Sequence, residues 1–94
     1  MTATLITELV IQPGKMPEVL KYLRDMRADV RANEPFAKFY EMYEMPERPN
    51  EVWVVEVFEN EAGKEAHLKR HAYRTPKFDT FLAKPAKLNV AVEI

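Results

Sequence analysis

Hydrophobic and polar residues repeat with two different periods along this chain of 94 residues, and the period separates strands from helices. Residues 4–11 place apolar side chains on both faces of an extended segment, which Pro13 and Gly14 then interrupt. From residue 15 to about residue 33, apolar side chains recur at helical spacing and predict an amphipathic helix of about five turns at 3.6 residues per turn. Pro35 favours an end to this helix.

The next two segments predict a β-hairpin. Residues 37–45 form an aromatic-rich segment that suits a strand. Residues 46–50 are polar, include two prolines and suit a turn. Residues 51–58 then form a second strand of the hairpin, and this strand is apolar on both of its faces.

A second helix is predicted for residues 61–72. Asn60 is a suitable N-cap residue, and Glu61 is favourable near the positive end of the helix dipole. Thr75 followed by Pro76 begins a further short helical piece. The apolar stripe that we expect the second helix to bury is small and consists of Ala62, Ala66 and Leu68.

The last segment alternates strictly, as a half-buried strand does. Its apolar face consists of Leu88, Val90, Val92 and Ile94. The element order is therefore βαββαβ, in a single domain that spans residues 1–94. Short connections and right-handed crossovers favour a ferredoxin-like α+β fold for this order, with a four-stranded antiparallel sheet and helices on one face. The first and third strands then lie side by side at the centre.

The strand at residues 51–58 also indicates a second copy of the chain. One of its faces holds Val52, Val54 and Phe58, and the other holds Trp53, Val55 and Val57. The predicted helices cover one face of the sheet only. The other face would expose an apolar patch of roughly several hundred Å², which is more than a monomer usually tolerates. We therefore predict a homodimer that packs through its sheet faces.

Composition excludes several functions. The net charge is -1 and the basic residues are scattered, which is not the pattern of a nucleic-acid-binding protein. The chain has no cysteine or serine and only two glycines, so thiolate metal sites, serine nucleophiles and glycine-rich cofactor loops are excluded. Residues 1–8 contain no basic leader, and no apolar run approaches the roughly 20 residues of a bilayer helix. We expect a cytoplasmic protein without a membrane partner.

His67 and His71 are the candidate catalytic residues. They stand four residues apart on the second predicted helix, so both imidazoles can reach one point in space. Such a pair can bind a metal with a carboxylate such as Glu56, or it can simply line a groove. Because the sequence fixes no third ligand, we expect no metal. A histidine beside an apolar cleft is also a natural general base near neutral pH.

Two carboxylates interrupt the apolar central strands. Glu8 and Glu56 would cost free energy there unless each is paired or hydrogen-bonded. They either line a polar site or pair with a basic residue such as Arg24, Arg27 or Arg74, and we favour pairing.

Aromatic residues supply a candidate pocket for a flat organic molecule. Pockets of this kind are mostly apolar with few polar groups. The residues that we expect to contribute are Tyr40, Trp53, Tyr73 and Phe78, with Glu56 as a polar neighbour. Packing in the core or at the dimer interface is the alternative role for Trp53 and Phe78.

Several short motifs resemble the antibiotic biosynthesis monooxygenase family of dimeric α/β barrels. The resemblance covers nearly the whole chain. Its motifs are Asn33-Glu34-Pro35, Phe39-Tyr40-Glu41-Met42-Tyr43, Val55-Glu56-Val57-Phe58-Glu59-Asn60-Glu61 and Glu65-Ala66-His67-Leu68. The resemblance implies a small oxygenase that oxidises phenols or quinols with O2 and without flavin, haem or metal, so no cofactor is expected.

The chain departs from the family pattern at identifiable positions. Phe36 replaces the usual glycine after the Glu-Pro turn, and Lys77-Phe78 stands where members commonly have a histidine before phenylalanine, with His71 displaced upstream. A haem-degrading branch has an asparagine, a tryptophan and an iron-binding histidine where this chain has Thr7, His67 and Leu82. The resemblance therefore does not extend to haem oxygenation.

These observations favour a cofactor-independent monooxygenase that acts on an aromatic, phenolic or quinol-like small molecule. His67 or His71 would accept the proton, and Tyr40, Trp53 and Tyr73 would shape the pocket. Two alternatives remain open. One is an isomerase or lyase that acts on a small carbonyl compound. The other is a non-catalytic dimeric module for ligand binding or stress response, which bulky residues such as Phe36 and Phe39 would favour if they filled the pocket.

Overall fold

A computed structural model describes all residues, 1–94, and has the predicted βαββαβ order. Its elements are β1 (Ala3–Val10), α1 (Met16–Asn33), β2 (Ala37–Glu44), β3 (Glu51–Phe58), α2 (Glu61–His71), the 3-10 turn η1 (Ala72–Arg74), α3 (Thr75–Asp79) and β4 (Lys87–Val92). None of the helices combines the length and the apolar character needed to span a bilayer.

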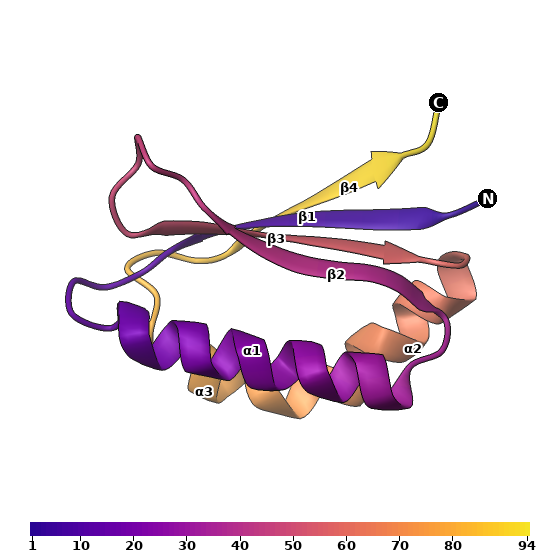
Figure 1. The fold of residues 1–94 in the computed structure, drawn as a ribbon, viewed down its shortest axis with the longest axis horizontal. Helices are drawn as coiled ribbons and strands as arrows, with labels where there is room; N and C mark the ends of the chain where they lie inside the picture. The colour runs from indigo at the N-terminus through magenta and orange to yellow at the C-terminus, as the bar shows by residue number, and fades with distance from the viewer.

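The strands form one antiparallel sheet in the order β2-β3-β1-β4, so β1 and β3 occupy the centre. All helices lie on the same side of this sheet, and both chain ends lie at one end of it (Figure 1). Leu5 faces Glu56 across the central pair, and Leu9 faces Val52. The ferredoxin-like fold is therefore confirmed, with a sheet that does not close on itself.

Local signals account for the main turns. Gly14 has φ +84°, a conformation that glycine adopts without steric cost, and it leads the chain from β1 towards α1. Asn50 has φ 64° in the turn between β2 and β3, where asparagine is among the better-tolerated residues. The side chain of Asn60 caps α2 as predicted, because its Oδ1 accepts a hydrogen bond of 2.9 Å from the backbone N–H of Gly63.

The core lies between the helices and the helix-facing side of the sheet. From α1 it receives Val19, Leu23, Met26 and Val30, which recur at helical spacing and are all buried. From the central strands it receives Leu5, Leu9, Val52, Val54 and Phe58. Alternation along β3 places Val52, Val54, Glu56 and Phe58 on this buried side. A carboxylate therefore lies within the core layer of a central strand.

The face that α2 buries differs from the predicted one. Ala62, Ala66 and Leu68 are exposed, whereas Gly63, His67 and His71, spaced four residues apart, face the protein. A Cβ atom added to Gly63 would lie 3.2 Å from the Cβ of Phe36, so the absence of a side chain lets α2 approach closely. The small alanine stripe offers little apolar area. The carboxylates of Glu34 and Glu56, which contact the two histidines, favour the orientation in which His67 and His71 face inward.

The apolar face of β4 is more exposed than the half-buried strand that was predicted. Opposite partners in an antiparallel pair share one face, so the pairing of Leu5 with Val90 puts the apolar residues of β4 on the helix side. The helices do not reach this edge strand, and the apolar side chains are therefore exposed rather than half-buried. Their exposed fractions are 54% for Leu88, 67% for Val90 and 72% for Val92.

The opposite face of the sheet carries no helix (Figure 1). Its centre consists of Trp53, Val55 and Val57 of β3, which are only partly buried, and Phe39 and Tyr43 of β2 are exposed on the same face. The helices therefore leave the face of β3 with Trp53, Val55 and Val57 uncovered (Figure 1).

We expect the two faces of α2 to respond oppositely to a new charge. Gly63→Glu should lower the free energy of unfolding by at least about 2 kcal/mol, because the side chain would overlap Phe36 and bury a carboxylate. The matched variant Ala66→Glu lies on the exposed face and should change it by about 0.5 kcal/mol or less. Urea denaturation measures both values. Equal losses would contradict this orientation of α2.

Candidate functional site

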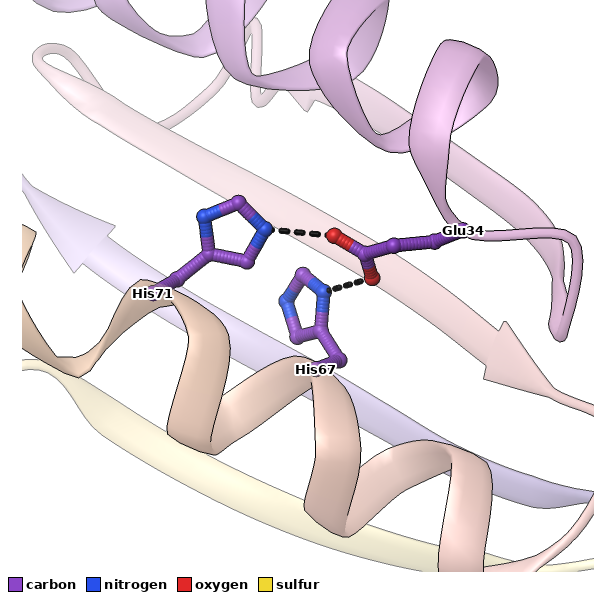
Figure 2. A group of neighbouring side chains, drawn as sticks. All are labelled: Glu34, His67 and His71. Carbon is purple, nitrogen blue, oxygen red and sulfur yellow. Dashed lines mark hydrogen bonds and ion pairs between the residues drawn. The ribbon is translucent and has the colours of Figure 1, made fainter.

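A buried carboxylate organises the candidate site. Glu34 is the C-cap residue of α1, where its backbone N–H donates a hydrogen bond of 2.9 Å to the carbonyl oxygen of Val30. Pro35 then turns the chain towards β2. The side chain of Glu34 is 0% exposed and points at α2, where each of its two oxygens meets a different histidine (Figure 2).

His67 is held between two carboxylates. Its Nδ1 lies 2.6 Å from Oε1 of Glu34, and its Nε2 lies 3.1 Å from Oε1 of Glu56 on β3. Burial alone would lower the pKa of His67, but Glu56 and Glu34 outweigh burial and raise the pKa above its ordinary value. The imidazolium form is favoured, with both ring nitrogens donating. His67 therefore has no free nitrogen with which to accept a proton.

His71 is in the opposite state. Its Nε2 lies 2.5 Å from Oε2 of Glu34, whereas its Nδ1 is buried without a hydrogen-bond partner and points away from Glu34 (Figure 2). Burial lowers the pKa of His71, and the charge on His67 adds to this effect against the opposing influence of Glu34. A carboxylate on one nitrogen fixes the tautomer with the proton there. The lone pair of a neutral imidazole is thus left on Nδ1.

Arg70 completes the environment of Glu34. Its Nη1 donates to Oε2 of Glu34 at 2.6 Å, and its Nη2 donates to Oδ1 of Asp29 at 2.8 Å. Burial would raise the pKa of Glu34, but hydrogen bonds from His71, His67 and Arg70 hold it below its ordinary value. The hydrogen bond from Arg70 likewise lowers the pKa of Asp29. Glu34 is therefore ionised.

These residues have the composition of a metal site, but their charges are already balanced. Glu34, His67 and His71 offer ligand atoms within 4.8 Å of one another. The third potential ligand is therefore Glu34, whereas the sequence suggested Glu56. Three carboxylates face three cations: Asp29, Glu34 and Glu56 face Arg70, Arg74 and protonated His67. A divalent ion would add positive charge beside Arg70. Our expectation that no metal binds stays a prediction, and this balance supports it.

A cavity of about 210 Å³ adjoins the cluster, between the sheet and the helices. Its wall is mostly apolar and includes Leu5, Leu23, Met26 and Phe78. The polar residues of the wall include Tyr40, Glu56, His71 and Arg74. Burial raises the pKa of Tyr40, and the charges of Glu56 and Glu34 raise it further, so its hydroxyl stays protonated and can donate a hydrogen bond.

Four predicted site residues line this cavity: Tyr40, Glu56, His71 and Phe78. His67 does not line it and lies between Glu34 and Glu56. Trp53 lies on the helix-free face of the sheet, because alternation along β3 turns it away from Glu56, and it donates to Glu51 at 2.8 Å. Tyr73 is 72% exposed on η1. The aromatic pocket predicted from all four aromatic residues is therefore not assembled.

The pairing expected for the strand carboxylates is found, but with other partners. Glu56 pairs with His67 rather than with an arginine. Glu8 accepts a hydrogen bond of 2.9 Å from Asn89, and its Oε2 lies 3.7 Å from Nζ of Lys87. Glu34 is a functional candidate that the hydrophobic pattern of the sequence does not reveal, because in that pattern it only marks the end of a helix. Its place in the Asn33-Glu34-Pro35 motif was the available signal.

Known structures share this architecture. A protein from Caulobacter crescentus CB15 that bears the name antibiotic biosynthesis monooxygenase as a provisional assignment has a TM-score of 0.88 at 22% identity, covering 98% of this chain and 91% of that one. Rv0793 from Mycobacterium tuberculosis has a TM-score of 0.90 at 16% identity, with coverage of 100% and 96%. PA3566 from Pseudomonas aeruginosa has a TM-score of 0.83 at 20% identity, with coverage of 99% and 94%. At these identities the likeness shows the fold.

The fold and the buried carboxylate-histidine cluster define a small ferredoxin-like α+β protein with a ligand-sized cavity under its sheet. A sequence profile described as antibiotic biosynthesis monooxygenase matches residues 2–77. The chain belongs to the antibiotic biosynthesis monooxygenase family. No curated protein matches it.

We expect the two histidines to differ in protonation near neutral pH. Long-range proton-nitrogen NMR correlations of 15N-labelled protein should show His71 as the neutral tautomer with its proton on Nε2, and His67 with both nitrogens protonated. As the pH falls below about 6.5, the ordinary histidine pKa, His71 should keep its neutral form longer than a free histidine. Titration of both rings near 6.5 would contradict the assigned network.

Proposed function

We propose that this protein is a monooxygenase that uses O2 to oxidise a small aromatic, phenolic or quinol-like molecule without a metal or organic cofactor, and that His71 is its proton acceptor. The observation that best supports this proposal is the lone pair on Nδ1 of His71, buried and unpartnered in a residue that lines the cavity. Membership of the monooxygenase family supports the reaction class.

The chemistry needs little from the protein. His71 accepts a proton from the bound substrate, and the electron pair left behind makes the substrate anion rich enough in electrons to reduce O2. Carbon-oxygen bond formation gives a peroxide, which takes up a proton and loses water to leave a carbonyl. One oxygen atom then enters the product and the other leaves as water. The substrate supplies all the electrons, and the protein supplies a base, an apolar cavity and orientation.

The bulky residues that would have favoured a non-catalytic module do not fill the cavity. Phe36, which replaces the usual glycine, packs beside Phe58 and against Gly63, and it does not line the cavity. Phe39 lies opposite Val57 on the helix-free face and is 40% exposed. Neither bulky side chain fills the cavity, which remains available to a ligand.

An isomerase or lyase on a small carbonyl compound is the second candidate. Tyr40 favours it, since a hydroxyl that stays protonated lines the same cavity as an unprotonated base. A hydroxyl that polarises a substrate carbonyl through a hydrogen bond, together with a base, suffices to move a proton between two atoms of the substrate. The requirement for O2 separates this candidate from the first one.

We also propose that the protein is a homodimer that packs through the helix-free face of its sheet. The side chains of Trp53, Val55 and Val57 form the centre of that face. Phe39 and Tyr43 extend it across β2. A second copy of the same face is an apolar surface that can cover it.

The enzymatic proposal predicts O2 consumption in an oxygen-electrode assay with a panel of hydroquinones, unchanged after dialysis against EDTA. His71→Gln should lower the rate by about 100-fold or more, because the proton acceptor is lost. The control Lys69→Gln changes an exposed residue of α2 and should leave the rate unchanged. Equal rates for His71→Gln and the unaltered protein would exclude His71 as the base. Turnover of a carbonyl compound without O2 would favour the second candidate.

The dimer proposal predicts that sedimentation velocity at micromolar concentration gives the mass of two chains. Val55→Asp should shift the protein to a monomer, because a carboxylate would be buried at the centre of the interface. Ala66→Asp places the same charge on the exposed face of α2 and should leave the dimer intact. A monodisperse monomer of the unaltered protein would refute the proposal.

A further inference from the structure

The cavity has a second buried polar atom without a partner. Nε of Arg74 has no hydrogen bond, although Arg74 belongs to the cavity wall together with His71. The rest of the guanidinium is only loosely engaged. Its Nη2 lies 3.5 Å from Oδ2 of Asp29, and its carbon lies 5.2 Å from the centre of the Tyr73 ring. A buried donor left unpaired costs free energy that a ligand oxygen can recover.

The backbone places Arg74 beside His71. His71 ends α2 and Arg74 ends the 3-10 turn that follows directly, so the two residues are three positions apart in continuous helical structure. Residues at this spacing lie on the same side of a helix, with roughly 5–6 Å between their Cβ atoms. The hydroxyl of Tyr22 donates to the carbonyl oxygen of Arg74 at 3.5 Å and attaches this turn to α1.

The two unpartnered atoms have opposite requirements. The neutral His71 can only accept a hydrogen bond at Nδ1, whereas the guanidinium of Arg74 can only donate one at Nε. A carbonyl oxygen can only accept and therefore satisfies Arg74 alone, whereas a hydroxyl serves both atoms only where it lies within hydrogen-bond distance of both. Asp29 does not pair with Nε of Arg74: its Oδ2 lies 3.5 Å from Nη2 and has no hydrogen bond, and Nε is likewise without a partner.

We propose that the cavity binds a compound in which an enol or phenol hydroxyl stands next to a carbonyl oxygen, with the hydroxyl at Nδ1 of His71 and the carbonyl oxygen at Nε of Arg74. This inference rests on the proposed role of His71 as proton acceptor. It makes Arg74 the residue that selects the substrate class. Both atoms are covered by neighbouring side chains in the unliganded chain, so ligand contact requires a small shift of that cover.

The arrangement also explains how the ionised substrate would be held. When the hydroxyl proton moves to Nδ1 of His71, the bonding electron pair stays on the substrate oxygen. Conjugation spreads this charge to the neighbouring carbonyl oxygen, which lies at the permanently charged guanidinium of Arg74. Donors that are already in place where charge develops stabilise it without reorganisation. A phenol without the carbonyl would lose this stabilisation.

The size of the cavity sets an upper limit on the buried part of the ligand. A volume of about 210 Å³ exceeds the roughly 150 Å³ of an engineered cavity that binds benzene, but not by a second full ring. The reacting portion is therefore a single ring, or an open-chain group of that size, with its two oxygens at one edge.

Equilibrium binding under nitrogen tests this inference separately from oxygenation. The probes are 2′-hydroxyacetophenone, whose phenol hydroxyl stands on the ring carbon next to the acetyl group, and phenol and acetophenone, which have one of the two groups each. Their dissociation constants are measured by NMR titration. We expect 2′-hydroxyacetophenone to bind at least about tenfold more tightly than either single-group probe, since a hydrogen bond to a charged group contributes about that factor. Arg74→Gln should abolish this preference. Arg48→Gln, an exposed arginine remote from the cavity wall, should retain it.

Three results would overturn the inference: equal affinity for all three probes, no binding of 2′-hydroxyacetophenone, or a preference that survives Arg74→Gln. If Arg74→Gln fails to fold by circular dichroism, Arg74→Lys keeps the charge but lacks Nε and should lose most of the preference. Selective binding without O2 consumption would support this site while the proposed oxygenation fails. O2 consumption with a lone phenol as readily as with its carbonyl-bearing analogue would reject the inference and leave the oxygenation standing.

Discussion

The buried carboxylate of Glu34 is the constraint on which the rest of the site depends. One oxygen accepts a hydrogen bond from His67, and the other accepts hydrogen bonds from His71 and Arg70. An ionised group with no exposed surface would be strongly unfavourable if any of these donors were missing. Each donor in turn is placed by α2. The same contacts therefore dock the second helix, set the charge of one histidine and fix the tautomer of the other.

The fold supplies the precision that this arrangement needs. Glu34 is attached to the end of α1, and Glu56 comes from the central strand β3, where neighbours on both sides restrict movement. Gly63 permits the close contact of α2 with Phe36, so the bulky residue at the Glu-Pro turn is accommodated. His67, between two carboxylates, is a structural cation, and this leaves His71 as the one histidine with a free lone pair. Two histidines on the same face of one helix thus differ in protonation and in the chemistry open to them.

The charged cluster of the site and the uncovered apolar surface lie in different parts of this molecule. The charges of the site lie between the helices and the sheet, in a cluster whose carboxylates and cations balance. The apolar surface that remains uncovered lies elsewhere, on the helix-free face of the sheet and along β4. Leu88 belongs both to the exposed strip of β4 and to the cavity wall. A partner that covers this strip would therefore also close one side of the cavity.

The sequence by itself determined the element order, the sheet and the division of β3 into two apolar faces, because periodicity is a local property of the chain. Only the structure decided that the face with Val52 and Val54 is the buried one. The sequence also identified His67, His71 and Glu56 as chemically notable, and the short motifs pointed to the family. Only the tertiary structure decided that α2 turns its histidines inward and leaves Ala62 and Ala66 outside. That choice depends on Glu34, which lies 33 residues before His67 in the chain. Pattern analysis weighs apolar area along one segment, whereas a buried ion pair is an interaction between segments, and in this helix it outweighed a stripe of small apolar residues.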